Sequence, residues 1–214
     1  MRFVFILMLF AFLSNIKICL AEKREIFLES LETQIISTPS EWGHLERYKG
    51  VCDSLKELER GIDFLKGLID EKRKVPELYT MLGLFYIERI EFVSDIEKGF
   101  LAGCAMEEFN MALAIDSLSW GALYSRGMVY LNMPPAFAEY ELALKDFQKL
   151  LEIQKKSDKV EKHYVLTYIS LGDLYVKMKK KNEAKKIWMK GKEQFPDSEE
   201  LKNRVKELAT DSHR

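Results

Sequence analysis

Small, apolar and aromatic residues recur at helical spacing through most of this chain, and the pattern is clearest over residues 165–196. Two apolar faces of helical period are separated there by the polar turn "KMKKKN". The segment is therefore predicted to form two short helices joined by a turn. The defining positions are Tyr168, Leu171, Gly172 and Tyr175 on the first face and Ala184, Trp188 and Gly191 on the second, before Pro196.

The same spacing occurs upstream. One copy has Tyr79, Leu82, Gly83 and Tyr86, followed by Ala105, Phe109 and Ala112. Another has Leu123, Gly127 and Tyr130, followed by Ala143, Phe147 and Leu150, with Arg126 at the position of the leucine. A weaker copy has Trp42, Leu45 and Tyr48, followed by Gly61, Leu65 and Leu68. Extra residues separate the two helices in the second and third copies, around "RIEFVSDIEKGF" and "NMPPAFAEYE".

This spacing resembles the tetratricopeptide repeat, in which an aromatic residue, Leu-Gly, Tyr, Ala, Phe and Pro recur over about 34 residues. The resemblance implies an all-α fold: a right-handed superhelix of three to four antiparallel helix pairs with a C-terminal capping helix. The segments implied are a signal peptide at 1–21, an N-terminal helical segment at 22–41, a repeat domain at 42–208 (42–75, 76–119, 120–164, 165–198 and a cap at 198–208) and a tail at 209–214. Asp197 and Glu200 resemble a capping box for the last helix, and its Leu201, Val205 and Leu208 form an apolar stripe expected to face the array.

Each signature residue has a packing role under this hypothesis. Gly83, Gly127 and Gly172 let the second helix of a pair approach the first closely. Aromatic residues of both helices are expected to fill the space between one repeat and the next: Tyr86, Tyr130 and Tyr175, with Phe109, Phe147 and Trp188.

The first residues have the composition of an export signal. Met1-Arg2 precedes an uncharged apolar run over residues 3–14, and Ala21 precedes a plausible cleavage point. An uncleaved anchor is the alternative, but a membrane span needs roughly 20 apolar residues, and Asn15 and Lys17 interrupt the run. Export predicts a periplasmic or secreted protein. A lipid anchor on Cys19 is disfavoured because Lys17-Ile18 precede it.

Charge is distributed unevenly. Residues 22–146 carry 14 Lys and Arg against 23 Asp and Glu, a net of −9, whereas residues 149–214 carry 17 against 11, a net of +6. We interpret the lysines near the C-terminus as solvated helix faces and turns. An exported chain that is acidic overall is a poor candidate for binding nucleic acid.

No catalytic motif is present: the chain lacks a glycine-rich phosphate loop, His-Glu-x-x-His, Cys-x-x-Cys and Gly-x-Ser-x-Gly. The histidines (His44, His163 and His213) and the cysteines Cys52 and Cys104 show no metal-ligand spacing. We expect no enzyme activity, no cofactor and no metal. The two cysteines are interpreted as small apolar side chains, although the predicted compartment permits a disulfide.

Function is then expected on the concave surface, which the first helices of the repeats line in proteins of this family. The predicted groove strip consists of Thr80, Leu84 and Ile87, then Tyr124, Met128 and Leu131, then Ile169, Asp173 and Val176. The family's carboxylate clamp, built from Lys, Asn and Arg, is absent, because Thr80, Tyr124 and Ile169 occupy those positions. The strip is expected to bind another protein or peptide, or to be covered by residues 91–100 or by the helix before Trp42.

Two function hypotheses follow: an exported, non-catalytic scaffold for protein–protein interaction, and a periplasmic carrier of a small apolar ligand that assists a solute uptake system. They differ in the ligand, which is a protein for the scaffold and a small apolar molecule for the carrier. A small molecule that stays with the purified chain in native mass spectrometry favours the carrier.

The export hypothesis makes a direct prediction. Mass spectrometry of the protein from its native host should find a mature chain beginning at Glu22, because the signal would be removed after Ala21. A mature chain that retains Met1 would contradict it.

Overall fold

The computed structural model describes residues 22–71 and 74–211, with side chains described up to residue 206. The predicted signal peptide at 1–21, the end of the predicted tail and the side chain of Leu208 lie outside this part. Among the described residues the secondary structure is helical throughout, with no strand. The prediction of an all-α fold is therefore confirmed.

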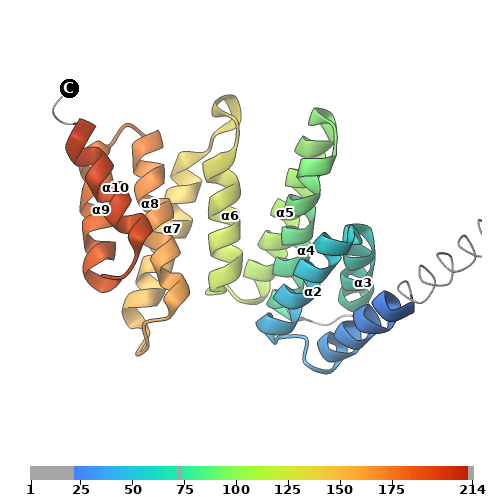
Figure 1. Cartoon of the computed structure of the whole chain (residues 1–214). Helices are drawn as coiled ribbons and strands as arrows, with labels where there is room; N and C mark the ends of the chain where they lie inside the picture. Colours follow the sequence, from blue (N-terminus) through green and yellow to red (C-terminus); the bar gives the residue numbers. More distant parts are fainter. Residues whose placement is uncertain (1–21, 72–73, 212–214) are drawn as a thin grey trace, which may run out of the picture.

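Ten α-helices follow one another in the described residues (Figure 1). The first spans residues 22–37. The others are α2 (Trp42–Leu55), α3 (Leu58–Asp70), α4 (Pro76–Arg89), α5 (Asp95–Ile115), α6 (Trp120–Asn132), α7 (Tyr140–Lys156), α8 (Val165–Lys177), α9 (Lys181–Gln194) and α10 (Glu199–Asp211). Short 3₁₀ segments are η1 (Ile90–Phe92), η2 (Pro135–Phe137) and η3 (Lys162–Tyr164).

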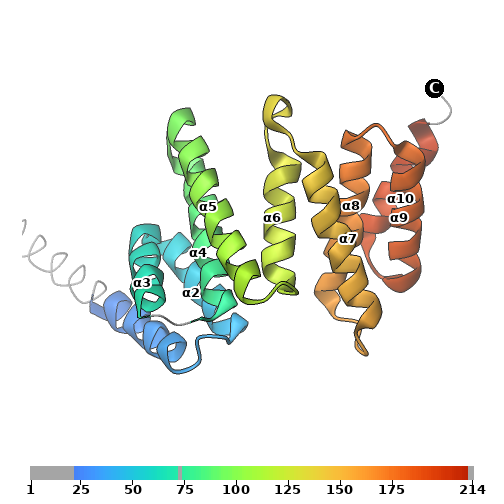
Figure 2. The same cartoon turned by 180° about the vertical axis from the view of Figure 1, so that it is seen from behind.

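The helices form sequential antiparallel pairs that stack in chain order, from residues 22–37 at one end to α10 at the other (Figures 1 and 2). The core divides into three clusters along the stack. The first runs from the N-terminal helix to α5, the second covers α6, α7 and α8, and the third joins α8, α9 and α10. Buried residues of α8 belong to both the second and the third cluster, whereas those of α5 belong only to the first and those of α6 only to the second.

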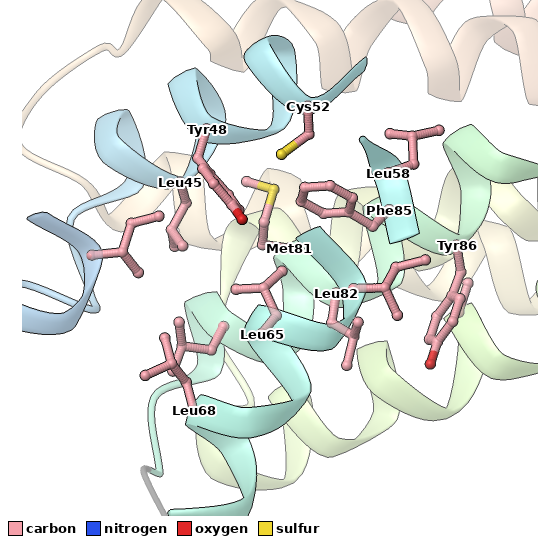
Figure 3. Packing of buried hydrophobic residues seen from close by; sticks show 14 of the residues in the cluster. Leu45, Tyr48, Cys52, Leu58, Leu65, Leu68, Met81, Leu82, Phe85 and Tyr86 are labelled. Atoms are coloured by element: carbon pink, nitrogen blue, oxygen red, sulfur yellow. The ribbon is translucent and has the colours of Figure 1, made fainter. Parts of the chain in front are cut away.

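The weakest predicted repeat, α2 with α3, is fully integrated into the first cluster. Tyr48 and Cys52 point from α2 toward Met81 and Phe85 of α4 (Figure 3). The rings of Tyr48 and Phe85 lie 6.2 Å apart, and Tyr48 also meets the edge of Phe64 at 5.3 Å. Burial rather than motif identity holds this pair in the stack.

Each recognisable pair is closed by an aromatic ring that lies against a glycine. A Cβ built on Gly83 would fall 2.5 Å from Cε1 of Phe109, and one on Gly127 would fall 2.8 Å from Cε1 of Phe147. On Gly172 it would collide with the Trp188 indole. The prediction that glycine permits a close crossing is confirmed. The expected place of Phe109, Phe147 and Trp188 is wrong, because each ring fills the space left by the glycine within its own helix pair.

The extra residues of the second copy extend the helical hairpin. α5 has 21 residues, and its start is fixed by a capping box in which the Glu97 carboxylate accepts hydrogen bonds from the backbone and hydroxyl of Ser94. The apolar residues of this insertion differ in burial: Val93 packs half-buried against the first cluster, whereas the exposed fractions of Phe92, Ile96 and Phe100 are 67%, 90% and 70%.

The capping helix α10 is present, but its cap differs from the prediction. α10 begins at Glu199, and the hydroxyl of Ser198 accepts a hydrogen bond from the Leu201 N–H. The cap is therefore Ser198 and not Asp197. Leu201 is buried and Val205 packs against the same cluster, as the apolar stripe predicted.

Replacing the crossing glycine tests this packing. Gly172→Leu should lower the free energy of unfolding by several kcal/mol, roughly 3 or more, because the added side chain overpacks the Trp188 crossing. Gly67→Ala is the matched control: nothing lies within 4 Å of its added Cβ, so it should raise stability by about 1 kcal/mol. Urea denaturation measures both, and a Gly172→Leu protein as stable as the parent would refute the crossing.

Candidate functional site

The residues of the predicted groove strip lie on α4, α6 and α8, the first helices of three successive pairs. Their exposure differs. Thr80, Leu131 and Ile169 are buried, and Val176 is exposed by 38%. The remaining members are half-buried: Leu84, Ile87, Tyr124, Met128 and Asp173. The strip is therefore only partly buried, and whether it binds a partner stays a prediction.

Thr80 is buried where α4 meets α6. A Cβ built on Gly121 would lie 3.5 Å from the methyl carbon of Thr80 and 3.8 Å from the Trp42 ring. The Thr80 hydroxyl donates to the Pro76 carbonyl at 2.8 Å, so its polar atom is satisfied within α4. Thr80 thus has a packing role at this joint.

Tyr124 belongs to an aromatic group between α6 and α8. Its ring stacks on Trp120 at 4.9 Å between centroids, and His163 meets the edge of Trp120 at 4.4 Å. The Tyr124 hydroxyl shares a 3.1 Å hydrogen bond with that of Ser170, and burial raises the pKa of Tyr124. The pKa of His163 is lowered by burial, which favours its neutral ring. These contacts tie two repeats together.

The capping helix occupies the C-terminal end of the strip. Arg204 of α10 donates from Nε and from Nη2 to the two carboxylate oxygens of Asp173, each at 2.8 Å. The same guanidinium lies 6.0 Å from the Trp188 ring centroid. Asp173 is therefore engaged by the chain's own last helix.

The helix before Trp42 packs on the N-terminal end of the stack. Its Leu28, Leu31 and Ile35 are buried in the first cluster. Arg60 of α3 grips Glu32 with two hydrogen bonds, of 2.8 and 3.1 Å, and Tyr48 of α2 donates to Glu32 at 2.7 Å. This helix is thus tied to α2 and α3 (Figure 1).

The half-buried apolar members of the strip are Leu84, Ile87 and Met128, with exposed Val176 beyond them. Two surface hollows lie elsewhere. One, of about 600 Å³, is lined by residues 138–142 with Met178 and Lys180. The other, of about 290 Å³, lies among Leu118, Ile153, Tyr164 and polar residues of α7.

Solved structures with this arrangement are tetratricopeptide-repeat proteins. A thermophilic one from Thermus thermophilus aligns with a TM-score of 0.64 and 16% identity, covering 91% of this chain and 95% of that chain. One from Parabacteroides merdae gives 0.55 and 18%, covering 87% and 70%, and MamA gives 0.54 and 18%, covering 79% and 86%. The chain has the tetratricopeptide-repeat fold. No family model matches the sequence, and no curated protein sequence matches it closely.

Within this tetratricopeptide-repeat fold, Arg126 replaces the usual leucine of the third pair for a structural reason. It donates to both carboxylate oxygens of buried Asp146 on α7, at 2.9 and 2.7 Å, and to Asn110 on α5 at 2.7 Å. Hydrogen bonding to Asp146 raises the pKa of Arg126. The departure from the motif was visible in the sequence, but its partners were not.

Sites for chemistry are not evident in the part of the chain that the structure describes. No group of three or more His, Cys, Asp or Glu side chains there is arranged to hold a metal ion. Cys52 and Cys104 are free thiols, and burial raises the pKa of Cys52 to about 11, which makes it a poor nucleophile. None of the described helices is long and apolar enough to cross a bilayer.

The Glu32 contacts predict a pH dependence. Burial alone would raise the pKa of Glu32, but the hydrogen bonds from Arg60 and Tyr48 outweigh it, and the pKa is lowered. Its stabilising contribution is therefore complete above the unfolded-state pKa, about 4.3, and is lost as pH falls through the lowered folded-state value.

Glu32→Gln should accordingly be less stable than the parent at pH 7, by roughly 1–3 kcal/mol, and this gap should close as the pH falls through the lowered folded-state pKa of Glu32. Urea denaturation across the pH range measures it. Glu29→Gln, an exposed change on the same helix, serves as control and should show no such gap. A Glu32→Gln gap that persists unchanged in acid would contradict the assignment.

Proposed function

We propose that this protein is an exported, non-catalytic scaffold that binds another protein or peptide along the face of α4, α6 and α8. The observation that carries the proposal is the row of incompletely buried apolar side chains on three successive first helices: Leu84, Ile87, Met128 and Val176. A partner that covers these side chains would remove apolar surface from water.

Two observations support a row that is open to a partner rather than covered by the chain itself. The inserted segment keeps Phe92, Ile96 and Phe100 in solvent, so they do not cover the strip. The N-terminal helix is held at α2 and α3 by Glu32, Arg60 and Tyr48. An amphipathic helix or an extended peptide from a partner has the shape to lie along such a row.

The chemistry of the row favours an apolar ligand surface over a charged one. The single carboxylate of the groove strip, Asp173, is paired with Arg204. Thr80, Tyr124 and Ile169 occupy the positions at which the family's clamp has charged or polar residues. A partner that presents an acidic C-terminal tail therefore finds no complement here. We therefore propose that recognition rests on apolar contact.

Export is part of the proposal and rests on the sequence of residues 1–21, with its Arg2, its apolar run and Ala21. The proposed compartment is the periplasm or the exterior.

The test is a comparison of captured partners. Leu84→Glu/Met128→Glu should abolish capture of the partner from the envelope fraction, because two carboxylates would enter the apolar contact. Met189→Glu changes an exposed apolar residue of α9 and should leave capture intact. Quantitative mass spectrometry of the captured proteins measures the difference. Equal capture by all three proteins would remove this face from consideration, and a co-purifying small molecule would favour the carrier.

A further inference from the structure

A second apolar surface lies on the outside of the α4–α5 hairpin. Ile96 and Phe100 lie four residues apart on α5 and away from its buried face, which is formed by residues such as Leu101 and Ala105. Phe92 ends η1, just before α5 begins, and is also exposed. We call Phe92, Ile96 and Phe100 the α5 ridge. The exposed fractions of these three side chains, from the end of η1 and the first turns of α5, are 67%, 90% and 70%.

The ridge stands on an element that is specifically folded. The capping box of Ser94 and Glu97 sets the first turn of α5, and Lys98 pairs with Asp95 at 2.8 Å in the same turn. The start of α5 rises past the ends of α2 and α3 in both views (Figures 1 and 2). The ridge therefore lies on an ordered helix start, and the preceding repeat does not cover it.

Two glycines beside the ridge, Gly99 and Gly103, are not required by packing within the chain. Gly99 and Gly103 are exposed, and no atom lies within 4 Å of a Cβ built on either. Glycine is unfavourable inside a helix, and the glycines at the helix crossings of this chain each accommodate a ring. A bare strip beside a bulky ridge lets a second helix backbone come close.

The rim of the ridge is acidic. Glu91, Glu97 and Glu107 are exposed on the same hairpin, and hydrogen bonds from Ser94 lower the pKa of Glu97, which keeps it ionised. The nearby cations each have a partner: Lys98 pairs with Asp95, Arg89 pairs with Glu59 at 2.7 Å, and Lys66 lies over the Tyr86 ring at 5.6 Å. Residues 22–146 as a whole carry the net negative charge of the chain.

We infer that the α5 ridge docks an amphipathic helix of a partner protein whose apolar stripe is flanked by Lys or Arg. Charge favours this occupant over two others. A second copy of the ridge, or an anionic lipid surface, would place negative charges against Glu91, Glu97 and Glu107. This surface is separate from the α4–α6–α8 face, so it gives the scaffold a second binding site.

The area fits one helix. Each exposed aromatic side chain offers a large part of the roughly 150–250 Å² that such a side chain can bury, so the ridge presents about 400 Å². That area is similar to the area of the largest exposed apolar patch on a typical monomer, which is often functional. It is about half of what each partner contributes to a standard interface of two folded domains.

The test uses a defined probe: a fluorescent peptide of about five helical turns with leucines on one face and lysines on the other. We expect the full chain to bind it, measured by anisotropy, with an affinity that falls as salt is added. Ile96→Ser/Phe100→Ser should weaken binding at least tenfold. Phe137→Ser, an equally exposed apolar residue of η2, is the matched control and should bind as the parent does.

Gly103→Ala separates a docking role from a structural one. The substitution should raise the melting temperature, since the added methyl meets nothing, and yet weaken peptide binding because the backbone approach is blocked. Ile96→Ser/Phe100→Ser should melt like the parent, since both side chains are exposed.

Four outcomes would overturn the inference. The first is equal or tighter binding of a peptide with the same leucines and glutamates in place of lysines. The second is a dimer in sedimentation that Ile96→Ser/Phe100→Ser dissociates. The third is ridge-dependent binding to phosphatidylglycerol vesicles without binding to the lysine peptide. The fourth is loss of the peptide in Leu84→Glu/Met128→Glu rather than in the ridge variant, which would place the peptide on the inner face.

Discussion

The contact on which the stack depends is the aromatic ring of a second helix lying in the space left by a glycine of the first. Phe109 on Gly83, Phe147 on Gly127 and Trp188 on Gly172 repeat the same contact in three consecutive pairs. The missing side chain lets the helices approach, and the ring buries a large apolar area at the crossing. Because each pair is closed in this way, its outer sides are free to pack on the neighbouring pairs.

Polar contacts then fix how the pairs and the end helices sit on one another. Glu32 with Arg60 and Tyr48 fastens the N-terminal helix, and Arg204 with Asp173 fastens the C-terminal one. Two-pronged guanidinium–carboxylate contacts also fix one register, because both oxygens of the carboxylate are engaged at once. The ends of the array are therefore oriented by ion pairs, and its interior by apolar packing together with the Arg126–Asp146 pair.

The helices, their pairing and the glycine crossings could be predicted from the sequence because they depend on spacing within about 34 residues. The partner of Arg126 and the burial of Thr80, Leu131 and Ile169 could not, because they depend on contacts between repeats. The structure of the inserted residues could be predicted in part, because "SDIE" at 94–97 has the pattern of a capping box and indicates the start of a helix. The engagement of Asp173 depends on where α10 lies, which no local pattern specifies.

The division of the core between α5 and α6 has a consequence for how the repeats are joined. Buried residues of α8 bind the second and third clusters into one body, but none of the described helices contributes buried residues to both the first and the second. In a stacked array, stability is carried by each unit and its neighbour contacts. The first and second clusters meet through half-buried side chains, Leu113 of α5 and Val129 of α6, and through the hydrogen bond from Arg126 to Asn110. The joint between the second and third repeats is therefore partly polar, whereas α8 joins its neighbours through buried apolar side chains.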